Sequence, residues 1–229
     1  MKHPKDIQLW IQKQRRNGFE VTQIRYKLSE LSSGLTWVIH YMGHTENPLR
    51  SYGWDTAFVP ATRIVVFPVG ISGAGKNYLH ETRFVNSVMI EPDAIRRICT
   101  GSVSDQTRNA EVFDLCHHFL RREMSFGERG IYLSETHLWL QGIRDELEMV
   151  LAYGYEPIFV ILETASRDSE LCRERVREAI RSGEDRSATA EIIGRTGKPL
   201  IEEMSEGFIE MIESEEFKDL IRPYHVIRL

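Results

Sequence analysis

The stretch Arg63–Leu79, RIVVFPVGISGAGKNYL, decides the fold. It begins with a continuous apolar run, which is typical of a buried strand in a parallel sheet. The segment GISGAGK follows, with glycines and a lysine at the spacing of a phosphate-binding loop. Glycine lets such a loop curl so that its N–H groups point at phosphate oxygens, and the helix that follows presents its positive end to them. The residues predicted to hold the nucleotide are Gly70, Ser72, Gly73, Ala74, Gly75, Lys76, Asn77 and Tyr78.

Two residues of this loop carry specific expectations. Lys76 is predicted to reach the β- and γ-phosphates of ATP as a movable positive charge. Asn77 stands where such loops usually place the Ser or Thr whose hydroxyl binds Mg²⁺. An amide oxygen is also an acceptable Mg²⁺ ligand, directly or through water. ATP and Mg²⁺ are therefore the expected cofactors, with Asn77 as a candidate metal ligand.

After Arg63 the chain alternates between β-like and helical patterns. Apolar runs at 84–90, 130–136 and 157–164 read as strands, and amphipathic segments between them read as helices. This alternation predicts βαβ units and a parallel sheet with helices on both faces, an α/β fold over residues 61–229. A charged helical segment at about 166–197 and a final β-like YHVIRL complete this region.

Residues 1–60 differ in character from the rest of the chain. DIQLWIQKQRRNG predicts a short amphipathic helix, and FEVTQIRYKL and TWVIHYM predict a β-hairpin. GHTENPLRSYGWDT is predicted to be a loop. The region is therefore interpreted as an N-terminal α+β extension. Its aromatic residues have two open interpretations, stacking on nucleic-acid bases or packing on the sheet: Trp10, Trp37, Tyr41, Tyr52 and Trp54.

Composition bounds the function classes. The formal net charge of −5 argues against a protein that grips nucleic acid by bulk charge, although a local basic groove remains compatible with it. No apolar run approaches the roughly 20 residues of a membrane span, and the first ten residues lack a signal-peptide core. Three widely separated cysteines indicate reduced thiols. We expect no membrane partner and a cytoplasmic location, which for a viral protein is the host cytoplasm.

The segment IEPDAIRRICTGSVSDQTR (90–108) and the strand and helix that follow it resemble the kinase domain of bacteriophage-type polynucleotide kinases. The resemblance covers about Arg63 to Arg195. It implies a phosphotransferase in which Asp93 is the general base that accepts the proton of the attacking hydroxyl. It also implies that Arg96 contacts the substrate. Without the resemblance, Asp93 is an acidic residue in the first turn of a helix, where the helix dipole favours it.

The charged stretch SRDSELCRERVREAIRSGEDRS (166–187) lies where that family has an arginine-bearing helical lid. The resemblance implies that Arg173, Arg177 and Arg186 neutralise charge on the transferred phosphoryl group. The alternative is a solvated helix with Glu–Arg pairs at i, i+4 spacing. Arg144, near the start of another helix, is a further candidate for holding a substrate phosphate.

The chain departs from that family after the third predicted strand, where it reads SETH (134–137). We expect Glu135 to take over as a metal ligand, or Ser134 to hold the metal through water.

The resemblance implies a nucleic-acid hydroxyl as acceptor, more in DNA than in RNA. The acceptor is a 5′ end or, as in the phage kinases of 5-hydroxymethyluridine in DNA, a hydroxymethyl group on a base. Two alternatives stay open: a small-molecule kinase for a nucleoside, sugar or toxin-type substrate, and a nucleotide-binding module without catalysis. No oligomeric state is predicted.

Overall fold

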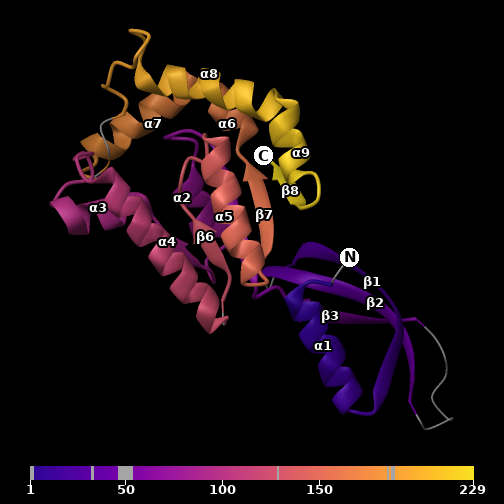
Figure 1. The fold of residues 1–229 in the computed structure, drawn as a ribbon. Helices are drawn as coiled ribbons and strands as arrows, with labels where there is room; N and C mark the ends of the chain where they lie inside the picture. Colours follow the sequence, from indigo (N-terminus) through magenta and orange to yellow (C-terminus); the bar gives the residue numbers. More distant parts are fainter. Residues whose placement is uncertain (1–2, 32–33, 46–53, 128, 185, 187–188) are drawn as a thin grey trace.

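The computed structural model describes residues 3–31, 34–45, 54–127, 129–184, 186 and 189–229 (Figure 1). These residues form two sheets that follow one another in the chain. A three-stranded antiparallel sheet is built by the first 60 residues, and a five-stranded parallel sheet by the remainder. No helix in the described ranges is long and apolar enough to cross a membrane.

The antiparallel sheet has the order β1-β2-β3, with β1 at Phe19–Leu31, β2 at Gly34–Thr45 and β3 at Asp55–Pro60. The predicted helix is α1, Lys5–Arg16, and the predicted hairpin is β1–β2. The third strand was not predicted. Its start lies in the expected loop, and it pairs with β2 from Tyr41↔Asp55 to Thr36↔Pro60. The part of the expected loop at 46–53, including Tyr52, lies outside the described residues.

One face of this sheet is covered by α1. Ile7, Trp37 and Ile39 are buried there, and the Trp10 and Tyr41 rings meet edge to face at 4.8 Å. Apolar burial and aromatic contacts of this kind stabilise a small sheet. The aromatic residues of the extension are thus mostly used in packing. Trp54 is different, because its side chain is exposed and its ring lies 5.3 Å from the guanidinium of Arg25.

The parallel sheet confirms the predicted α/β class. Its order is β5-β6-β4-β7-β8, with β4 at Ile64–Val69, β5 at Val88–Ile90, β6 at Ile131–Leu133, β7 at Glu156–Ile161 and β8 at His225–Arg228. The central strand β4 is buried along its whole length. It pairs in parallel with β6 on one side and β7 on the other.

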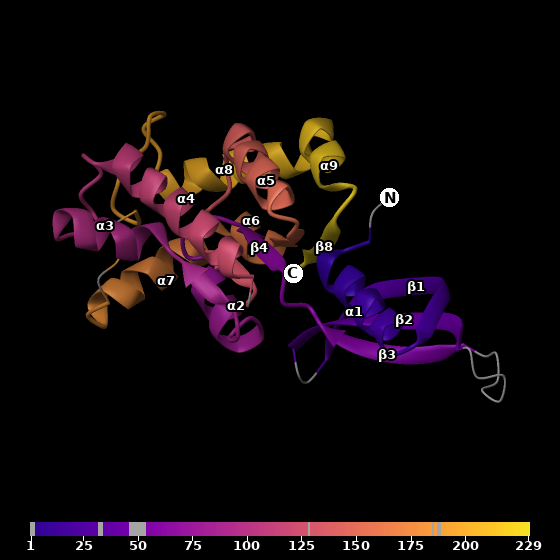
Figure 2. The same ribbon diagram turned by 60° about the horizontal axis from the view of Figure 1, so that its bottom comes forward.

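Helices cover both faces of this sheet (Figure 2). Helix α2 (Lys76–Arg83) lies on one face, and α4 (Asn109–Phe126) and α5 (Leu140–Ala152) lie on the other. The remaining helices are α3 at Pro92–Thr100, α6 at Glu163–Arg167, α7 at Ser169–Arg181, α8 at Leu200–Glu213 and α9 at Glu215–Ile221. Helices α8 and α9 are separate because the Ser214 hydroxyl accepts a hydrogen bond from the Phe217 N–H and starts a new helix.

The extension meets the parallel sheet at the start of β4, at the sheet's amino end. The buried carboxylate of Asp6 on α1 accepts hydrogen bonds from the backbone N–H groups of Thr62 and Arg63, at 3.0 and 3.1 Å. Figure 1 shows the extension at the opposite end of the molecule from α3 and α7. Residues of both parts share one buried apolar cluster. That residues 1–60 and 61–229 are separate domains stays a prediction.

Candidate active site

Three glycines give the loop after β4 its shape. Gly73 and Gly75 have φ angles of +83° and +97°, in the left-handed region that favours glycine. A Cβ on Gly73 would also lie 2.3 Å from the carbonyl oxygen of Cys172, so α7 packs directly on the loop backbone. At Gly70 the nearest atoms to an added Cβ are the Ser166 hydroxyl at 3.0 Å and Leu162 at 3.1 Å. The sequence spacing is thus explained by backbone conformation at Gly75 and by close packing at Gly70 and Gly73.

Lys76 begins α2 and folds back over this loop. Its ammonium group donates to the carbonyl oxygens of Ile71 at 2.8 Å and Gly70 at 3.2 Å. Burial lowers the pKa of Lys76 to about 8, although nearby acidic side chains, including Asp93, partly offset this effect. The first N–H groups of α2 have no acceptor within their own helix, so an anion at the start of the helix can accept from them. The local structure therefore gathers a cation and backbone donors at one anion-binding point.

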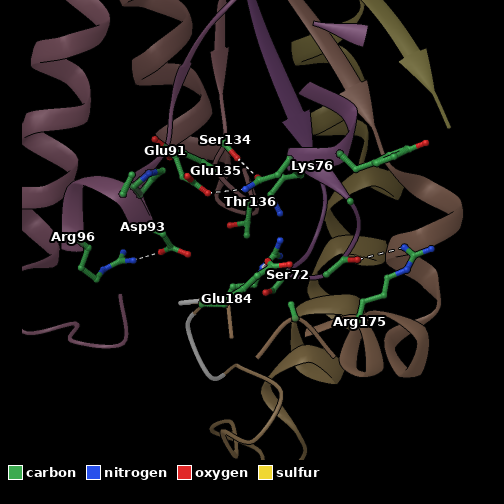
Figure 3. Close-up of a pocket in the computed structure, with 18 of the residues that line it drawn as sticks. Ser72, Lys76, Glu91, Asp93, Arg96, Ser134, Glu135, Thr136, Arg175 and Glu184 are labelled. Atoms are coloured by element: carbon green, nitrogen blue, oxygen red, sulfur yellow. Dashed lines mark hydrogen bonds and ion pairs between the residues drawn. The ribbon is translucent and has the colours of Figure 1, made fainter. Parts of the chain in front are cut away.

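The loop forms one wall of a cavity of about 830 Å³ (Figure 3). The opposite wall comes from α3 and the carboxyl ends of β5 and β6, and α7 with the segment after it closes a third side. Among the residues that the structure describes, five cationic and five acidic ones line the cavity: Lys76, Arg96, Arg97, Arg175, Arg186, Glu91, Asp93, Glu135, Glu178 and Glu184. The cavity lies at the carboxyl ends of the parallel strands beside β4, where ligands bind in open α/β sheets. Of the predicted nucleotide-binding residues, all but Gly70 and Ala74 line it.

Asn77 is held between two other side chains of the cavity. Its amide oxygen accepts a hydrogen bond from the Ser134 hydroxyl at 2.8 Å, and its amide nitrogen donates to Glu91 at 2.8 Å. Glu91 directly precedes α3 and was not among the residues predicted from the sequence. These three neighbouring side chains carry amide, hydroxyl and carboxylate oxygens, which are hard donors of the kind that Mg²⁺ prefers, although the Glu91 carboxylate contacts the amide nitrogen of Asn77. The donor set fits that metal.

Asp93 lies in the first turn of α3, facing the cavity, and forms an ion pair with Arg96. The Arg96 side chain is almost completely buried. Its guanidinium also donates two hydrogen bonds to the side-chain oxygen of Asn109, at 3.1 and 3.2 Å. A buried guanidinium fixed from two sides holds a carboxylate in a defined orientation. Both predicted residues are thus at the cavity, and the structure adds that Arg96 orients Asp93.

The arginines of α7 and of the segment after it divide into those that line the cavity and those that do not. Arg175 lines the cavity and donates to the carbonyl oxygen of Gly73 at 3.4 Å (Figure 3). Arg186 lines the cavity and forms an ion pair with Glu184 at 2.6 Å. Of the predicted lid arginines, only Arg186 is therefore at the cavity. Arg175 was not predicted.

Three predicted arginines lie away from the cavity. Arg173 donates to the carbonyl oxygen of Ala190 at 3.1 Å, and Arg177 pairs with Glu174 and Glu191 at 2.6 and 2.7 Å. Arg144 pairs with Glu216 of α9 at 2.6 Å on an exposed surface. Arg177 and Arg144 are thus occupied in surface ion pairs, which for Arg177 is the alternative interpretation of the charged helix, whereas Arg173 is bound to a backbone carbonyl.

Glu135 lines the cavity, but its carboxylate also belongs to a buried group of side chains behind the cavity wall. Its ligand atoms lie within 4.8 Å of those of His137 and Glu146. Burial and the neighbouring Glu146 carboxylate raise the pKa of Glu135. The acidic residue that contacts Asn77 is Glu91 instead. The structure therefore separates two predicted metal ligands, Asn77 and Glu135, into two different side-chain groups.

Comparison with solved structures finds, among others, three proteins that are similar to this chain. A candidate kinase from Chloroflexus aurantiacus J-10-fl is 14% identical with a TM-score of 0.47, over 74% of this chain and 85% of that one. The PezAT toxin–antitoxin system of Streptococcus pneumoniae is 13% identical with a TM-score of 0.36, over 68% and 89%. The Mycobacterium tuberculosis APS kinase in complex with AMPPNP and APS is 16% identical with a TM-score of 0.35, over 68% and 100%.

At these identities and scores no activity or substrate passes from those proteins to this chain. The sequence matches no protein-family model. It also has no significant match among the curated proteins. The functional conclusion therefore rests on the cavity itself.

Proposed function

We propose that the chain is a kinase that transfers the γ-phosphate of ATP to an alcohol. The observation that carries this proposal is that Lys76 and Asp93 face one cavity from opposite walls. A phosphate-binding cation and a carboxylate across from it are the two groups that in-line transfer to a hydroxyl needs. Neither wall alone distinguishes a kinase from a binding module.

Each wall has a separate task in this proposal. On the loop side, Lys76 and the N–H groups at the start of α2 bind the triphosphate. On the α3 side, Asp93 accepts the proton of the substrate hydroxyl while Arg96 holds its carboxylate in place. Arg175 and Arg186 lie on the α7 side, where a guanidinium can neutralise charge on the phosphoryl oxygens.

Asn77, Ser134 and Glu91 are the residues that would hold Mg²⁺, since hydrogen bonds join these three oxygen-bearing side chains beside the loop. When bound, the metal supplies positive charge to the β- and γ-phosphate oxygens. Glu91 supplies the negative charge that the neutral amide of Asn77 lacks. The loss of the usual hydroxyl at position 77 is thus offset by Ser134 and Glu91.

For the acceptor we propose a hydroxyl on nucleic acid, in DNA rather than RNA, at a 5′ end or on a hydroxymethylated base. Supporting this choice are the resemblance of residues 63–195 to phage polynucleotide kinases and the side chains beside Asp93. Arg97 and Phe113 line the cavity there, and Phe113 is partly exposed. Next to the catalytic carboxylate, an aromatic ring is a group on which a nucleobase can stack, and a guanidinium is a group that can bind its phosphates.

One observation favours a small-molecule acceptor as the second candidate. The aromatic extension, considered as a possible nucleic-acid surface, lies at the amino end of β4, whereas the loop lies at its carboxyl end. A six-residue strand separates the two by about 20 Å. None of the described residues of the extension therefore lines the acceptor site. The even balance of acidic and basic side chains in the cavity is also compatible with a small neutral alcohol.

The acceptor is identified by incubating the protein with γ-labelled ATP and Mg²⁺ and four classes of acceptor. These are 5′-hydroxyl DNA, 5′-hydroxyl RNA, DNA containing 5-hydroxymethyluracil, and a panel of nucleosides and sugars. We expect label on DNA. Label on a nucleoside or sugar, with none on DNA or RNA, would contradict the nucleic-acid acceptor and support the small-molecule acceptor. A Lys76→Ala variant should be inactive in every arm; transfer by this variant would show that the loop is not the ATP site.

A further inference from the structure

A compact group of metal-ligand side chains lies behind the wall of the cavity. It contains Glu135 and His137, directly after β6, and Glu146 on α5, with ligand atoms within 4.8 Å of one another. The His137 and Glu146 side chains are only 2% and 5% exposed. A fourth residue, His117 on α4, lies with its Nε2 atom 3.5 Å from Glu146. Three side chains of this group thus lie mutually close and mostly buried, and His117, whose side chain is 29% exposed, contacts the group through Glu146.

The contacts of a neutral His137 place two hydrogen-bond acceptors opposite each other, the Nε2 atom of the imidazole and a carboxylate oxygen of Glu146. Its Nδ1 atom lies 3.0 Å from the carbonyl oxygen of Pro68, which only accepts, so Nδ1 carries a proton. In a neutral imidazole Nε2 is then unprotonated, yet it lies 3.2 Å from a carboxylate oxygen of Glu146. Two acceptors at this distance in a buried site require a proton or a cation between them. Glu135 adds another acceptor to the same place.

The ligand spacing matches that of a metal centre. Around four-coordinate Zn²⁺, bonds of about 2.0–2.1 Å place neighbouring ligand atoms about 3.3 Å apart. The Nε2 atom of His137 lies 3.2 Å from Oε2 of Glu146, and the Nε2 atom of His117 lies 3.5 Å from the other carboxylate oxygen, Oε1. The bond from His137 Nδ1 to a backbone carbonyl is also the contact by which metal-binding histidines are usually oriented.

The backbone is strained at this point. His137 has φ = 51° and is the one non-glycine residue with a left-handed φ in the described part of the chain. Such conformations cost about 1–3 kcal/mol and persist where surrounding structure fixes them, often at functional sites. Here the strained conformation points the imidazole into the group rather than toward solvent.

We propose that Glu135, His137, Glu146 and His117 form a binding site for a divalent transition metal of the Zn²⁺ class. The bound metal would fasten β6 to α4 and α5. It would also fix the segment 134–137, in which the Thr136 carbonyl accepts from the Gly70 N–H at 3.1 Å and Ser134 contacts Asn77. This site is separate from the Mg²⁺ ligands of the nucleotide cavity, and its existence does not depend on kinase activity.

The test is metal content of the untagged protein. The chain is dialysed against EDTA, incubated with Zn²⁺ without nucleotide, freed of excess metal and analysed by mass spectrometry. We expect about one Zn²⁺ per chain, and less than about a tenth of that in His137→Gln and Glu146→Gln variants. His118→Gln is the matched control, because His118 neighbours His117 on α4 but is exposed. Asn77→Ala should retain the metal.

Two further measurements guard against a variant that fails to fold. In the wild type, Zn²⁺ should raise the Tm by several degrees, and Co²⁺ should give the intense visible absorption of a tetrahedral site, displaced by Zn²⁺. Absence of stoichiometric metal together with an unchanged Tm in the wild type would overturn the proposal. The group would then be a buried imidazolium paired with Glu146. Equal metal content in wild type and the two variants would overturn it as well.

Discussion

At the scale of single residues, Lys76 shows how the loop is prepared for phosphate. Its ammonium group is held by the carbonyl oxygens of Gly70 and Ile71, and burial lowers its pKa to about 8. Phosphate oxygens are better partners than carbonyls, because they carry charge. Nucleotide binding should therefore restore the pKa of Lys76 toward its ordinary value and take up a proton at alkaline pH.

The consequence is an alkaline limit on nucleotide affinity. Below pH 8 Lys76 is already protonated in the free protein. Above pH 8 the lysine must take up a proton from solvent when the nucleotide binds, and this lowers the affinity. We predict that the ATP Kd rises about tenfold between pH 7.5 and 9.5. Calorimetry across this range measures it. A Lys76→Met variant is the control and should bind weakly with little pH dependence; an unchanged Kd in the wild type would contradict the assigned role.

Residue patterns predicted the loop more completely than they predicted its partners. The spacing of Gly70, Gly75 and Lys76 identified the loop, and Asn77 was recognised as its departure. Glu91 was missed, although it follows a predicted strand just as Asp93 does. The rule that places ligands at strand carboxyl ends applied to both residues. Only its contact with Asn77 identifies Glu91 as a residue of the site. That contact depends on the order of the strands in the sheet, which local sequence patterns do not predict.

At the scale of elements, the face of α7 decides which arginines reach the cavity. Cys172 and Val176 are buried, and the cavity is lined by Arg175, Glu178 and Ala179 of this helix and by its C-cap residue, Ser182. These follow the i, i+3, i+4, i+7 spacing of one helical face. Arg173 and Arg177 lie on a different face, turned toward Ala190 and Glu191. Helical periodicity around Cys172 therefore contained the signal for Arg175, whereas alignment by resemblance did not.

We predict that Arg175→Ala lowers kcat at least about tenfold, because it removes a guanidinium from the phosphate side of the cavity. Arg177→Ala is the matched control, because it removes the same charge from a surface ion pair, and should stay within about twofold of wild type. Steady-state kinetics with saturating ATP measures both. Equal losses in the two variants would mean that α7 acts through its net charge.

The contact between α7 and the loop gives a second prediction at this scale. Gly73 and Gly101 have nearly the same φ, +83° and +82°, but only Gly73 has a backbone atom in the place of a Cβ. Alanine at Gly101 should cost about 1 kcal/mol of unfolding free energy from conformational strain alone. Gly73→Ala should cost about 3 kcal/mol or more, since α7 must also move. Urea unfolding of both variants measures the difference; equal costs would contradict the close approach of the helix.

At the scale of the whole molecule, the two sheets are joined through a buried carboxylate. Asp6 accepts from the N–H groups of Thr62 and Arg63 and from the Thr62 hydroxyl, and it pairs with the Arg63 side chain. We predict that Asp6→Ala lowers the free energy of unfolding by about 2–4 kcal/mol, because buried donors lose their partner. Asp219→Ala, which breaks an exposed pair with Arg222, should cost less than about 1 kcal/mol. Denaturant unfolding compares them; similar costs would show that the joint contributes little.

The order of elements along the chain could be predicted, and their arrangement in space could not. Alternating apolar and amphipathic segments predicted the α/β class and the hairpin, since both depend on local periodicity. The third strand β3 was missed because its pairing with β2 is a long-range contact. The position of the extension at the amino end of β4 follows from Asp6 and the Thr62–Arg63 backbone, a contact between residues 56 and 57 positions apart.

The central claim is that Asp93 acts as the base of a phosphotransferase whose ATP site is built by Lys76. The direct test is single-turnover transfer from γ-labelled ATP to the identified acceptor, measured for wild type, Asp93→Asn and the exposed-site control Asp114→Asn. We predict that Asp93→Asn lowers the rate about 10²–10⁴-fold while the ATP Kd stays within about twofold, and that Asp114→Asn is unchanged. Wild-type protein that binds ATP but transfers no phosphate, or an Asp93→Asn variant as fast as wild type, would contradict the account.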